Sequence, residues 1–332
     1  MKTKLAKPTK KLICEAADLI QKGEVVAFPT ETVYGLGANV YDVHAVAKIF
    51  EAKGRPADNP LIVHISKISQ IDGLVISIPT SAKKLMKKFW PGPLTIVLKK
   101  SKQVPEIVTA GLDSVAVRMP SNKIALSLIN AAGVPIAAPS ANSSGKPSPT
   151  SAKHVLEDLN GRIHLVIDGG QCEVGLESTV LSLAGSNPVL LRPGAITLEQ
   201  IEKVIGKVEV PLSVREKTEV EKPLSPGMKY KHYSPKAEVV LFIPSKEKDF
   251  TKFVFEHSEG KKIGIISFTK KVGLNNEFFF EGSLNAYAKS LFSALRELDE
   301  AGVELIIVEG VSDKGLGLAI MNRLKRAASK VV

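Results

Sequence analysis

Polar side chains suited to anion recognition gather in three short segments of this 332-residue chain. Hydroxyls and glycines lie in Phe28-Pro-Thr-Glu-Thr-Val-Tyr-Gly-Leu-Gly-Ala38, two cations in Lys53-Gly-Arg55-Pro, and a further hydroxyl and amide in Pro139-Ser-Ala-Asn142. A loop after a buried strand is where an enzyme places the groups that touch its ligand, because the scaffold fixes the loop ends while the backbone stays reachable. We therefore expect a small-molecule anion site on these loops.

The second of these segments places two cations on either side of a glycine, just past an expected helix. Lys53 and Arg55 can both project over the same pocket, where Arg forks onto a carboxylate or phosphate and Lys supplies a point charge. Taken alone, the segment is also explained by a solvated turn, and His64 by a core histidine. Ser140 and Asn142 can meet a ligand, but Ser and Asn also populate turns for local hydrogen bonding.

Two arginines stand at the ends of apolar runs, Arg118 before Met119-Pro120 and Arg192 in Leu190-Leu-Arg-Pro-Gly194. A guanidinium beside a strand that is buried on both faces should be paired. Its partner is either a core carboxylate or a bound anion, and the sequence leaves both open. Glu177-Ser-Thr-Val180 adds hydroxyls at the start of another expected strand.

Familiar nucleotide and hydrolase motifs fail when they are tested on this sequence. Valine stands where a dinucleotide fingerprint needs its third glycine in Gly35-Leu-Gly37-Ala-Asn-Val40, and proline replaces the magnesium-binding Ser or Thr of a P-loop in Ser144-Gly-Lys-Pro147. The chain has no HExxH, no GxSxG elbow and no Cys/His cluster, and Cys14 and Cys172 are isolated. We expect no protein-held metal, no catalytic triad and no disulfide framework.

Composition places the chain among ordinary globular proteins, with 44% hydrophobic and 24% charged residues and no apolar run near the roughly 18 residues that span a bilayer. Basic residues at the start are not followed by an apolar segment or a cleavage site, so we expect a cytoplasmic protein without membrane contact. The net charge of +11 favours anionic partners, although many lysines have the spacing of a solvated helix face. An aromatic content of 5% argues against a stacking platform for single-stranded nucleic acid.

Alternating helices and strands must position the polar loops. Apolar residues between 12 and 20 recur at helical spacing up to Gly23, a strand is expected at 24–28, and a Thr/Gly loop leads to a helix that Asp42 can cap and Gly54 ends. Further strands are expected at 61–65, 94–98, 115–119, 135–138, 165–167, 178–183 and 189–191, with helices at 122–132 and 151–159. This alternation predicts an α/β domain with a twisted, mixed sheet over residues 1–206.

A linker and a second domain are expected after it. Residues 207–236 are rich in Lys, Glu and Pro without an apolar period, yet Ser225-Pro-Gly-Met-Lys-Tyr-Lys-His-Tyr-Ser-Pro235 has too many specific side chains for a mere spacer. Strands are expected at 238–243, 262–267 and 304–309, and a helical stripe at Leu291, Leu295 and Leu298. Residues 237–332 therefore predict a smaller, Rossmann-like α/β domain.

Together these segments resemble the threonylcarbamoyl-AMP synthases, the YrdC-type family, in its long two-domain form. The likeness covers nearly the whole chain and rests on nine motifs in family order: Pro29-Thr-Glu-Thr-Val-Tyr-Gly-Leu-Gly37, Lys53-Gly-Arg55-Pro, Pro60-Leu-Ile-Val-His64, Trp90-Pro-Gly-Pro-Leu-Thr95, Val117-Arg-Met-Pro120, Pro139-Ser-Ala-Asn-Ser-Ser-Gly145, Glu177-Ser-Thr-Val180, Leu191-Arg-Pro-Gly194 and His232-Tyr-Ser-Pro235. It implies a YrdC-like catalytic domain, a fold first associated with double-stranded RNA, and an accessory domain from about residue 237.

The resemblance also implies a reaction, in which L-threonine, bicarbonate or CO₂, and ATP give threonylcarbamoyl-adenylate and pyrophosphate. Magnesium would be carried on the phosphates. The product would serve N6-threonylcarbamoylation of adenosine 37 in tRNA through a separate transferase. Such chemistry depends on alignment and charge neutralisation, so it needs no covalent nucleophile.

Roles carried over from the family divide the residues into two groups. The threonine site is expected to comprise Thr32, His64, Arg118, Ala138 and Ser178, with Arg118 on the carboxylate. The ATP contacts are expected from Arg55, Asn59, Ser114, Ser140, Ser148, Arg192 and Tyr233, while Lys53, Arg55 and Asn142 line a basic catalytic cleft for bicarbonate and phosphates. Because Tyr233 lies in the linker, the linker is expected to close as a lid over the nucleotide.

Two other functions remain as alternatives at this point. A non-catalytic protein that binds double-stranded RNA or tRNA would use the basic cleft, and would show salt-dependent RNA affinity without any response to threonine. A carbamoyl-transfer enzyme would use carbamoyl phosphate, but related proteins of that kind carry zinc-finger cysteines that two isolated cysteines do not supply.

Overall fold

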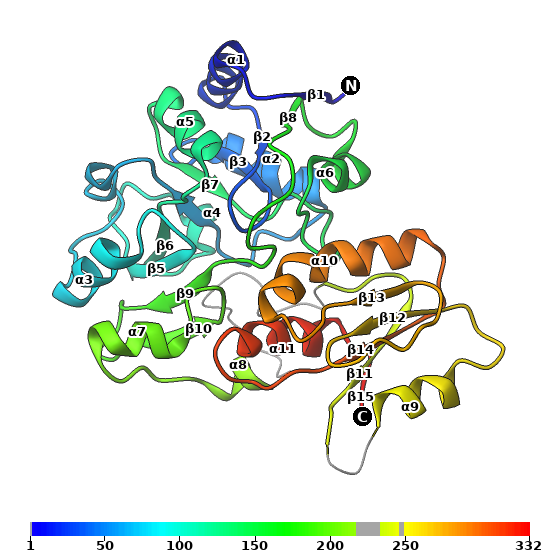
Figure 1. Ribbon diagram of the computed structural model, residues 1–332. Coiled ribbons are helices and arrows are strands. Elements are labelled where there is room, and N and C mark those ends of the chain that lie inside the picture. The colour runs from blue at the N-terminus through cyan, green and yellow to red at the C-terminus, as the bar shows by residue number, and fades with distance from the viewer. Residues whose placement is uncertain (1, 217–232, 246–248) are drawn as a thin grey trace.

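Two separate β-sheets organise the chain (Figure 1). The computed structural model describes residues 2–216, 233–245 and 249–332. The first sheet has ten strands in the order β1-β8-β2-β3-β7-β4-β6-β5-β9-β10, and the second has five in the order β13-β12-β14-β11-β15. The expected α/β class, with a large mixed sheet and a smaller second domain, is confirmed.

The first sheet mixes parallel and antiparallel pairs, as the sequence predicts. Its strands are β1 Lys4–Ala6, β2 Val26–Phe28, β3 Gly35–Asn39, β4 Ile62–His64, β5 Leu94–Lys99, β6 Ser114–Arg118, β7 Ile136–Ala138, β8 Leu165–Ile167, β9 Thr179–Ser182 and β10 Val189–Arg192. Every strand expected before residue 206 is present with small shifts at the ends, and β1 and β3 are additions.

The expected Thr/Gly loop is wrong in its second half, because residues from Gly35 form strand β3 between β2 and β7. A Cβ atom on Gly37 would lie 2.5 Å from Cγ2 of Ile136 and 2.7 Å from Cε1 of Phe28. The glycines therefore serve close side-chain packing inside a sheet, and they do not mark a flexible loop.

Five helices of the first domain begin at side-chain caps, at Thr9, Asp42, Asn122, Ser151 and Thr197. Asp42 accepts hydrogen bonds from the backbone N–H groups of His44 and Ala45, and Gly54 ends the same helix at φ 59°, where a glycine is favoured. The helices are α1 Lys10–Gln21, α2 Val43–Lys53, the 3₁₀ turn η1 Ile68–Ile71, α3 Thr80–Phe89, α4 Glu106–Thr109, α5 Lys123–Ala132, α6 Ala152–Leu159, α7 Leu198–Ile205 and α8 Leu212–Arg215.

The second sheet is parallel at every pairing, which confirms the expected Rossmann-like domain. Its strands are β11 Glu238–Phe242, β12 Ile263–Ser267, β13 Glu277–Phe279, β14 Leu305–Glu309 and β15 Lys330–Val331, and its helices are α9 Phe250–His257, α10 Leu284–Glu300 and α11 Leu316–Ala327. The expected apolar stripe on α10 is buried at Leu291, Leu295 and Leu298.

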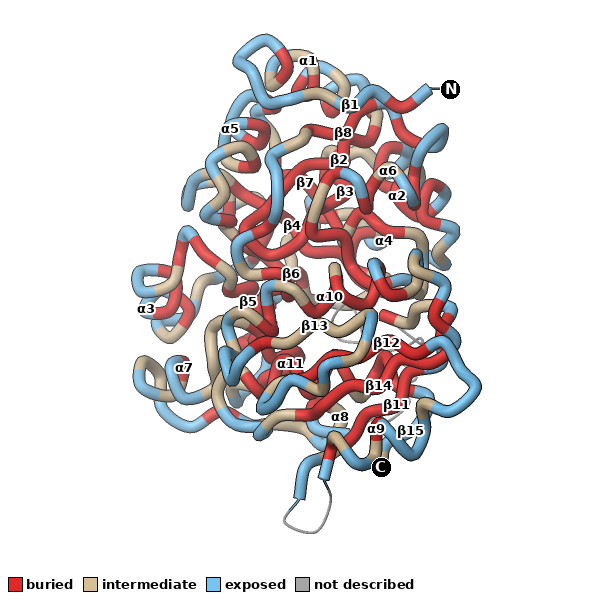
Figure 2. Tube along the Cα trace, turned by 45° about the vertical axis from the view of Figure 1, so that its right-hand side comes forward, coloured by how far each residue is buried: buried red, intermediate tan, exposed pale blue. Residues whose placement is uncertain are grey.

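Buried residues run through the central strands of both sheets (Figure 2). On the first sheet, successive side chains alternate between two cores, because strand residues point to opposite faces. Phe28 and Ile136 pack on one face with α1 and α5, while Ala27 and Ala137 belong to the core on the other face with α2, α3 and α6. This double burial holds the strand ends, where the polar residues lie, in fixed positions.

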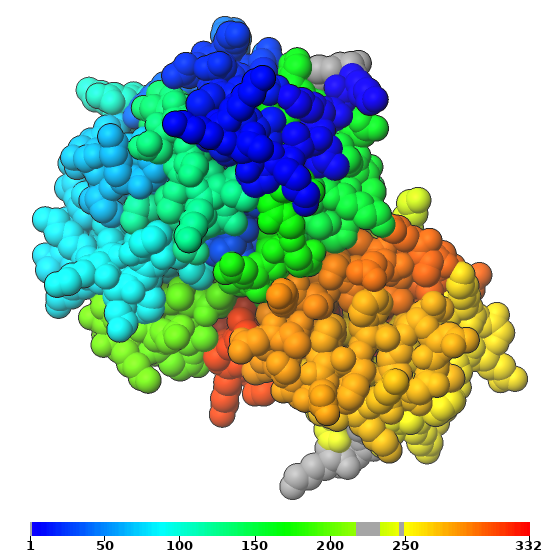
Figure 3. Space-filling view, turned by 45° about the horizontal axis from the view of Figure 1, so that its top comes forward, coloured from blue at the N-terminus to red at the C-terminus, as the bar shows by residue number. Residues whose placement is uncertain are grey.

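The second domain packs directly against the first through α10 and α11 (Figures 1 and 3). Arg296 of α10 is buried and donates to Asp158 Oδ2 at 2.7 Å and to the Pro147 carbonyl at 2.6 Å. A Cβ atom on Gly175 would lie 2.2 Å from the carbonyl oxygen of Lys289 in α10, so only glycine permits this approach. Contacts with the second domain thus fix the positions of two loops of the first domain, the one at Pro147 and the one at Gly175.

The predicted linker, 207–236, is only partly described. It contains the short helix α8, and residues 217–232, which include His232 and most of the expected lid, lie outside the described residues. The exact limits 1–206, 207–236 and 237–332 stay a prediction. Within the described ranges, no helix combines the length and apolarity needed to cross a membrane.

Candidate functional site

The first and third polar segments converge on one pocket because the strands that carry them are paired, and Arg55 of the second segment reaches the same pocket from just past the end of α2. His64 and Arg118 are register partners on the neighbouring parallel strands β4 and β6. A β-bridge joins Gly35 to Ser140, and the backbone N–H of Leu36 donates to the Pro139 carbonyl at 2.9 Å. The first and third segments therefore lie side by side at the same strand ends.

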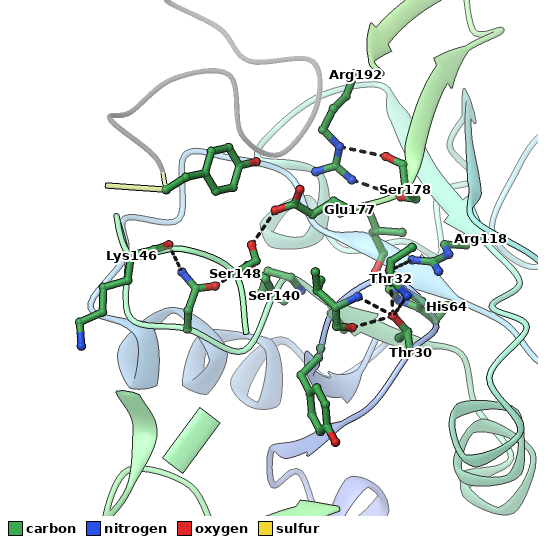
Figure 4. Close-up of a pocket in the computed structure, with 18 of the residues that line it drawn as sticks. Thr30, Thr32, His64, Arg118, Ser140, Lys146, Ser148, Glu177, Ser178 and Arg192 are labelled. Carbon is green, nitrogen blue, oxygen red and sulfur yellow. Dashed lines mark hydrogen bonds between the residues drawn. The ribbon is translucent and has the colours of Figure 1, made fainter. Parts of the chain in front are cut away.

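The pocket has two ends that differ in character (Figure 4). Its lining comprises Thr30, Thr32, Val33, Tyr34, Gly35, Arg55, Ile62, His64, Arg118, Ala138, Pro139, Ser140, Asn142, Lys146, Ser148, Glu177, Ser178, Arg192 and Tyr233. One end gathers Arg118, the two threonines and His64, and the other gathers Ser148, Glu177 and Arg192, with Ser178 between them. We call these the arginine–threonine end and the serine–glutamate end.

Hydrogen bonds fix Arg118 at the arginine–threonine end. Its Nη1 donates to Thr32 Oγ1 at 2.9 Å, and its Nε donates to the Gly92 carbonyl at 3.3 Å. Thr32 Oγ1 lies 2.8 Å from Thr30 Oγ1, whose own proton goes to the Val33 carbonyl. Thr32 therefore accepts from Arg118 and donates to Thr30, so the guanidinium cannot rotate without breaking this chain.

The partner of Arg118, which the sequence left open, is a core carboxylate. Arg118 Nη2 lies 2.7 Å from Glu31 Oε1, and both side chains are 4% exposed. Burial raises the pKa of Glu31, but the positive charge of Arg118 and the hydrogen bonds from Arg118 and from nearby backbone N–H groups together outweigh it, so the pKa lies below its ordinary value and the pair is ionised. A guanidinium has five N–H groups, and the contacts to Gly92, Thr32 and Glu31 use three of them, so two N–H groups remain for a second anion.

His64 is neutral at this end of the pocket. Burial, with the nearby charge of Arg118, lowers its pKa to about 3. Its Nδ1 lies 3.1 Å from the Ile62 carbonyl oxygen, which can only accept, so Nδ1 carries the proton. Nε2 is therefore left as a hydrogen-bond acceptor on a ring that lines the pocket.

This neutral histidine predicts a loss of stability in acid. The unfolded chain takes up a proton near pH 6.5 while folded His64 stays neutral to about pH 3, so the free energy of unfolding falls as the pH drops below 6.5. Its share of the loss between pH 7 and pH 4 is about 3 kcal/mol. Urea unfolding at both pH values should show a pH dependence that is smaller by about that amount in His64→Asn. His44→Asn, at an exposed position, should match the wild type; an unchanged dependence in His64→Asn contradicts the assignment.

Lys53 does not project over the pocket, so that part of the prediction for the two cations is wrong. It is the last residue of α2, lies on the buried face of that helix at 3% exposure, and its Nζ donates to the carbonyls of Ser140 and Asn142 at 2.5 Å each. Burial is the main cause that holds its pKa well below the ordinary value. Lys53 is therefore hydrogen-bonded to the loop that contains Ser140 and Asn142, and it stabilises the shape of that loop.

Arg55, in contrast, lines the pocket as expected. Its Nη2 donates to the Asn59 carbonyl at 3.1 Å, and its guanidinium carbon lies 5.9 Å from the centre of the Phe50 ring. Asn142 supports the neighbouring loop, because its Oδ1 accepts from Ser140 Oγ at 2.5 Å and its Nδ2 donates to the Lys146 carbonyl at 3.0 Å.

A second ionic network forms the serine–glutamate end. Arg192 donates to the carbonyl and the hydroxyl of Ser178 at 3.1 and 3.2 Å. Glu177 Oε1 accepts from Ser148 Oγ at 2.6 Å. Burial raises the pKa of Glu177, but the positive charges of Arg323 and Arg192 overcome it and lower the pKa to about 2, so Glu177 is a carboxylate at neutral pH.

Tyr233 closes the same end from the linker side. Its ring lines the pocket and stacks on Phe292 of α10, with centroids 5.0 Å apart. Its φ of 63° is a conformation that residues other than glycine rarely adopt, at a cost of about 1–2 kcal/mol. Contacts from the second domain therefore hold this residue in place.

Two expected contacts lie away from the pocket lining. Ser114 begins β6, four residues before Arg118, and the structure does not bring it to the pocket. Asn59 is fully buried, and its side-chain Nδ2 and Oδ1 have no hydrogen-bond partner in the described ranges. An unsatisfied buried amide costs about 1–3 kcal/mol. Ala138 and Ser178 do line the pocket.

Sequence reasoning missed the two buried carboxylates. Glu31 and Glu177 stand inside motifs that were already singled out, but acidic residues conflict with an anion site unless their arginine partners are known. The described residues contain no group of three His, Cys, Asp or Glu side chains placed to hold a metal ion.

Comparison with known families covers almost all of the chain. Residues 18–194 match the Sua5/YciO/YrdC family model, described as "Telomere recombination", and residues 196–329 match "Threonylcarbamoyl-AMP synthase, C-terminal domain". The chain belongs to the Sua5/YciO/YrdC family. Both matched regions together give it the long form of that family.

Relatives in the Sua5/YciO/YrdC family align over nearly their whole length. The threonylcarbamoyl-AMP synthase of Pyrococcus abyssi is 53% identical over 94% of this chain and 93% of its own, and that of Bacillus subtilis is 51% identical over 95% and 92%. The structure of P. abyssi Sua5 complexed with L-threonine has a TM-score of 0.93, with 49% identity over 100% of this chain and 99% of that one. Escherichia coli YciO has a TM-score of 0.52 at 26% identity and covers 58% of this chain.

Proposed function

We propose that this chain synthesises threonylcarbamoyl-adenylate from L-threonine, bicarbonate or CO₂, and ATP, and releases pyrophosphate. One observation carries the proposal: Arg118 lines the pocket with two N–H groups left over from its contacts to Gly92, Thr32 and Glu31, in a chain that superposes over its whole length on a relative solved with L-threonine. A substrate carboxylate would complete the hydrogen bonding of that guanidinium.

At the arginine–threonine end, the amino acid would lie with its carboxylate on Arg118 and its side chain near Thr32 and Ser178. Neutral His64 offers Nε2 as an acceptor for an N–H or O–H of the substrate. Ala138 supplies an apolar wall suited to a methyl group. A pocket with polar partners for a hydroxyl rejects valine more strongly than a difference of one methylene would allow, because valine leaves those partners unpaired.

ATP would occupy the serine–glutamate end and the cationic side of the pocket. Arg55, Ser140, Ser148, Arg192 and Tyr233 line this region, whereas Asn59 lies off the lining and keeps its proposed contact only as an inference from the family. Ser114 lies away from the lining and keeps its proposed contact only as an inference from the family. Lys53 and Asn142 would act by shaping the loop that faces the phosphates, with magnesium carried on those phosphates.

The reaction would need two bond-forming steps in this site. The uncharged amine of threonine attacks the carbon of CO₂, loses a proton and becomes a carbamate. A carbamate oxygen then attacks the α-phosphorus, and the bond to pyrophosphate breaks. Cations that stabilise the charge on the phosphates and hold the reactants in line supply the catalysis, so no side-chain nucleophile takes part.

The product suits a later transfer of the threonylcarbamoyl group to adenosine 37 of tRNA by a separate enzyme in the cytoplasm. Its mixed anhydride is labile in water, so closure of the linker over the nucleotide would protect the product from hydrolysis. The described end of the linker, at Tyr233, lies against the pocket and supports this placement.

Pyrophosphate release with different amino acids tests the proposed function. With ATP, magnesium and bicarbonate, we expect release with L-threonine and at least about 10³-fold less at equal concentrations of valine. Arg55→Ala should raise the KM for ATP by about 10-fold or more, since it removes a charge from the nucleotide side. Release that is independent of threonine and bicarbonate would overturn the proposal.

A further inference from the structure

A buried arginine of the second domain reaches the wall of the pocket. Arg323 lies on α11, and its side chain is 0% exposed. Its Nε donates to Glu177 Oε2 at 2.9 Å, and its Nη1 donates to the Pro193 carbonyl at 2.8 Å and to Asn322 Oδ1 at 3.0 Å. The guanidinium therefore ties Glu177 to the Arg-Pro turn that follows β10.

Glu177 divides its two carboxylate oxygens between the second domain and the pocket. Oε2 accepts from Arg323, while Oε1 accepts from the hydroxyl of Ser148 at 2.6 Å. Because a carboxylate is planar, a charge-assisted contact that holds one of its oxygens restricts where the other oxygen can lie. Arg323 therefore sets where Glu177 Oε1 stands and, through it, the direction of the Ser148 hydroxyl.

This arrangement decides what Ser148 can offer to a ligand. Its only proton is donated to Glu177, so the oxygen faces the pocket as an acceptor. A phosphate oxygen has no proton to donate at this point, and it would meet the negative charge of Glu177. A hydroxyl or amino group of a nucleoside can donate. The serine–glutamate end therefore suits the nucleoside half of ATP better than its phosphates.

We propose that Arg323 is a positioning residue for the nucleoside half of ATP, and that it acts through Glu177 to present Ser148 as a hydrogen-bond acceptor. This inference rests on the proposed function for the identity of the ligand. Among the described residues, no hydrogen bond or ion pair joins Arg323 to Thr32, His64 or Arg118. The second domain thus supports one end of the pocket only.

Calorimetry of Arg323→Met tests the proposal without turnover. Three ligands are titrated separately into wild type and variant: ATP with magnesium, inorganic tripolyphosphate with magnesium, and L-threonine. We expect the Kd for ATP to rise by about 10- to 100-fold, because a charge-assisted contact that orders the nucleoside site is lost. The Kd values for tripolyphosphate and L-threonine should change by less than about 3-fold. Arg323→Lys keeps the charge but loses the forked guanidinium, so its Kd for ATP should lie between those of the wild type and Arg323→Met.

A double-mutant cycle with Glu177→Gln separates positioning from general support of the fold. If Arg323 acts through Glu177, the double variant should bind ATP no more weakly than the weaker single variant. An additive loss would overturn the proposal, as would an equal loss for tripolyphosphate or L-threonine, or unchanged ATP binding in Arg323→Met. These results are distinct from a failure of the proposed function, which would appear in the wild type as ATP binding without threonine-dependent pyrophosphate release.

Discussion

Replacing Arg118 with methionine should abolish threonine-dependent pyrophosphate release, with kcat/KM for L-threonine lower by about 10³-fold or more. The guanidinium is the cation of the arginine–threonine end and is oriented by Thr32, the Gly92 carbonyl and Glu31. Two of its five N–H groups remain for a substrate carboxylate. Methionine has similar volume but cannot pair with a carboxylate. Threonine titration of the pyrophosphate assay gives the comparison.

A control must separate this loss from a loss of folding. Arg118→Met leaves Glu31 buried without its partner at 2.7 Å, and breaking a buried pair in this way costs about 3–5 kcal/mol. Adding Glu31→Met removes the stranded charge, so urea unfolding of the double variant should recover most of the stability. Activity should stay absent. Wild-type kcat/KM in the single variant, or threonine binding in the double variant, contradicts the role of Arg118.

Replacing Lys53 with methionine should lower kcat by about 10²-fold or more although the side chain never lines the pocket. Its Nζ donates to the Ser140 and Asn142 carbonyls, and without it one buried and one partly buried acceptor lose their donor, at a cost of up to about 1–3 kcal/mol each. The loop then loses the geometry that aligns Ser140 with ATP, and misplacement by about 1 Å can cost 10²-fold in rate. Steady-state kinetics and urea unfolding measure both effects.

Lys48→Met is the matched control, because Lys48 lies on the same helix and is paired with Glu24 at 2.7 Å near the surface. It should leave kinetics unchanged and alter the free energy of unfolding by less than about 1 kcal/mol. A Lys53→Met variant that keeps wild-type kcat would show that the loop holds its shape without the buried amine.

Local signals in the sequence were sufficient for most elements. Asp42 and Gly54 mark both ends of α2, and apolar runs locate the strands, because caps and periodicity depend on neighbours in sequence. Strand β3 was missed since its glycines fit against Phe28 and Ile136, and that packing involves residues far along the chain.

Long-range pairing also explains what was missed at the site. The sequence left Arg118 with either a carboxylate or an anion, and the fold gives it Glu31 while two of its five N–H groups remain for a second partner. Nothing in the sequence around Lys53 indicates that its amine will donate to two carbonyls of a distant loop. Arg323 lies in another domain from Glu177, so nothing in either segment indicates that they meet.

Detection of the adenylate product tests the central claim most directly. Protein, ATP, magnesium, L-threonine and ¹³C-labelled bicarbonate are incubated briefly, and the nucleotides are analysed by mass spectrometry beside the pyrophosphate assay. The account predicts an AMP derivative that contains threonine and one labelled carbon, formed in equal amount to pyrophosphate and absent with Arg118→Met. Pyrophosphate release without this labelled product, or AMP derivatives that lack threonine, would contradict it.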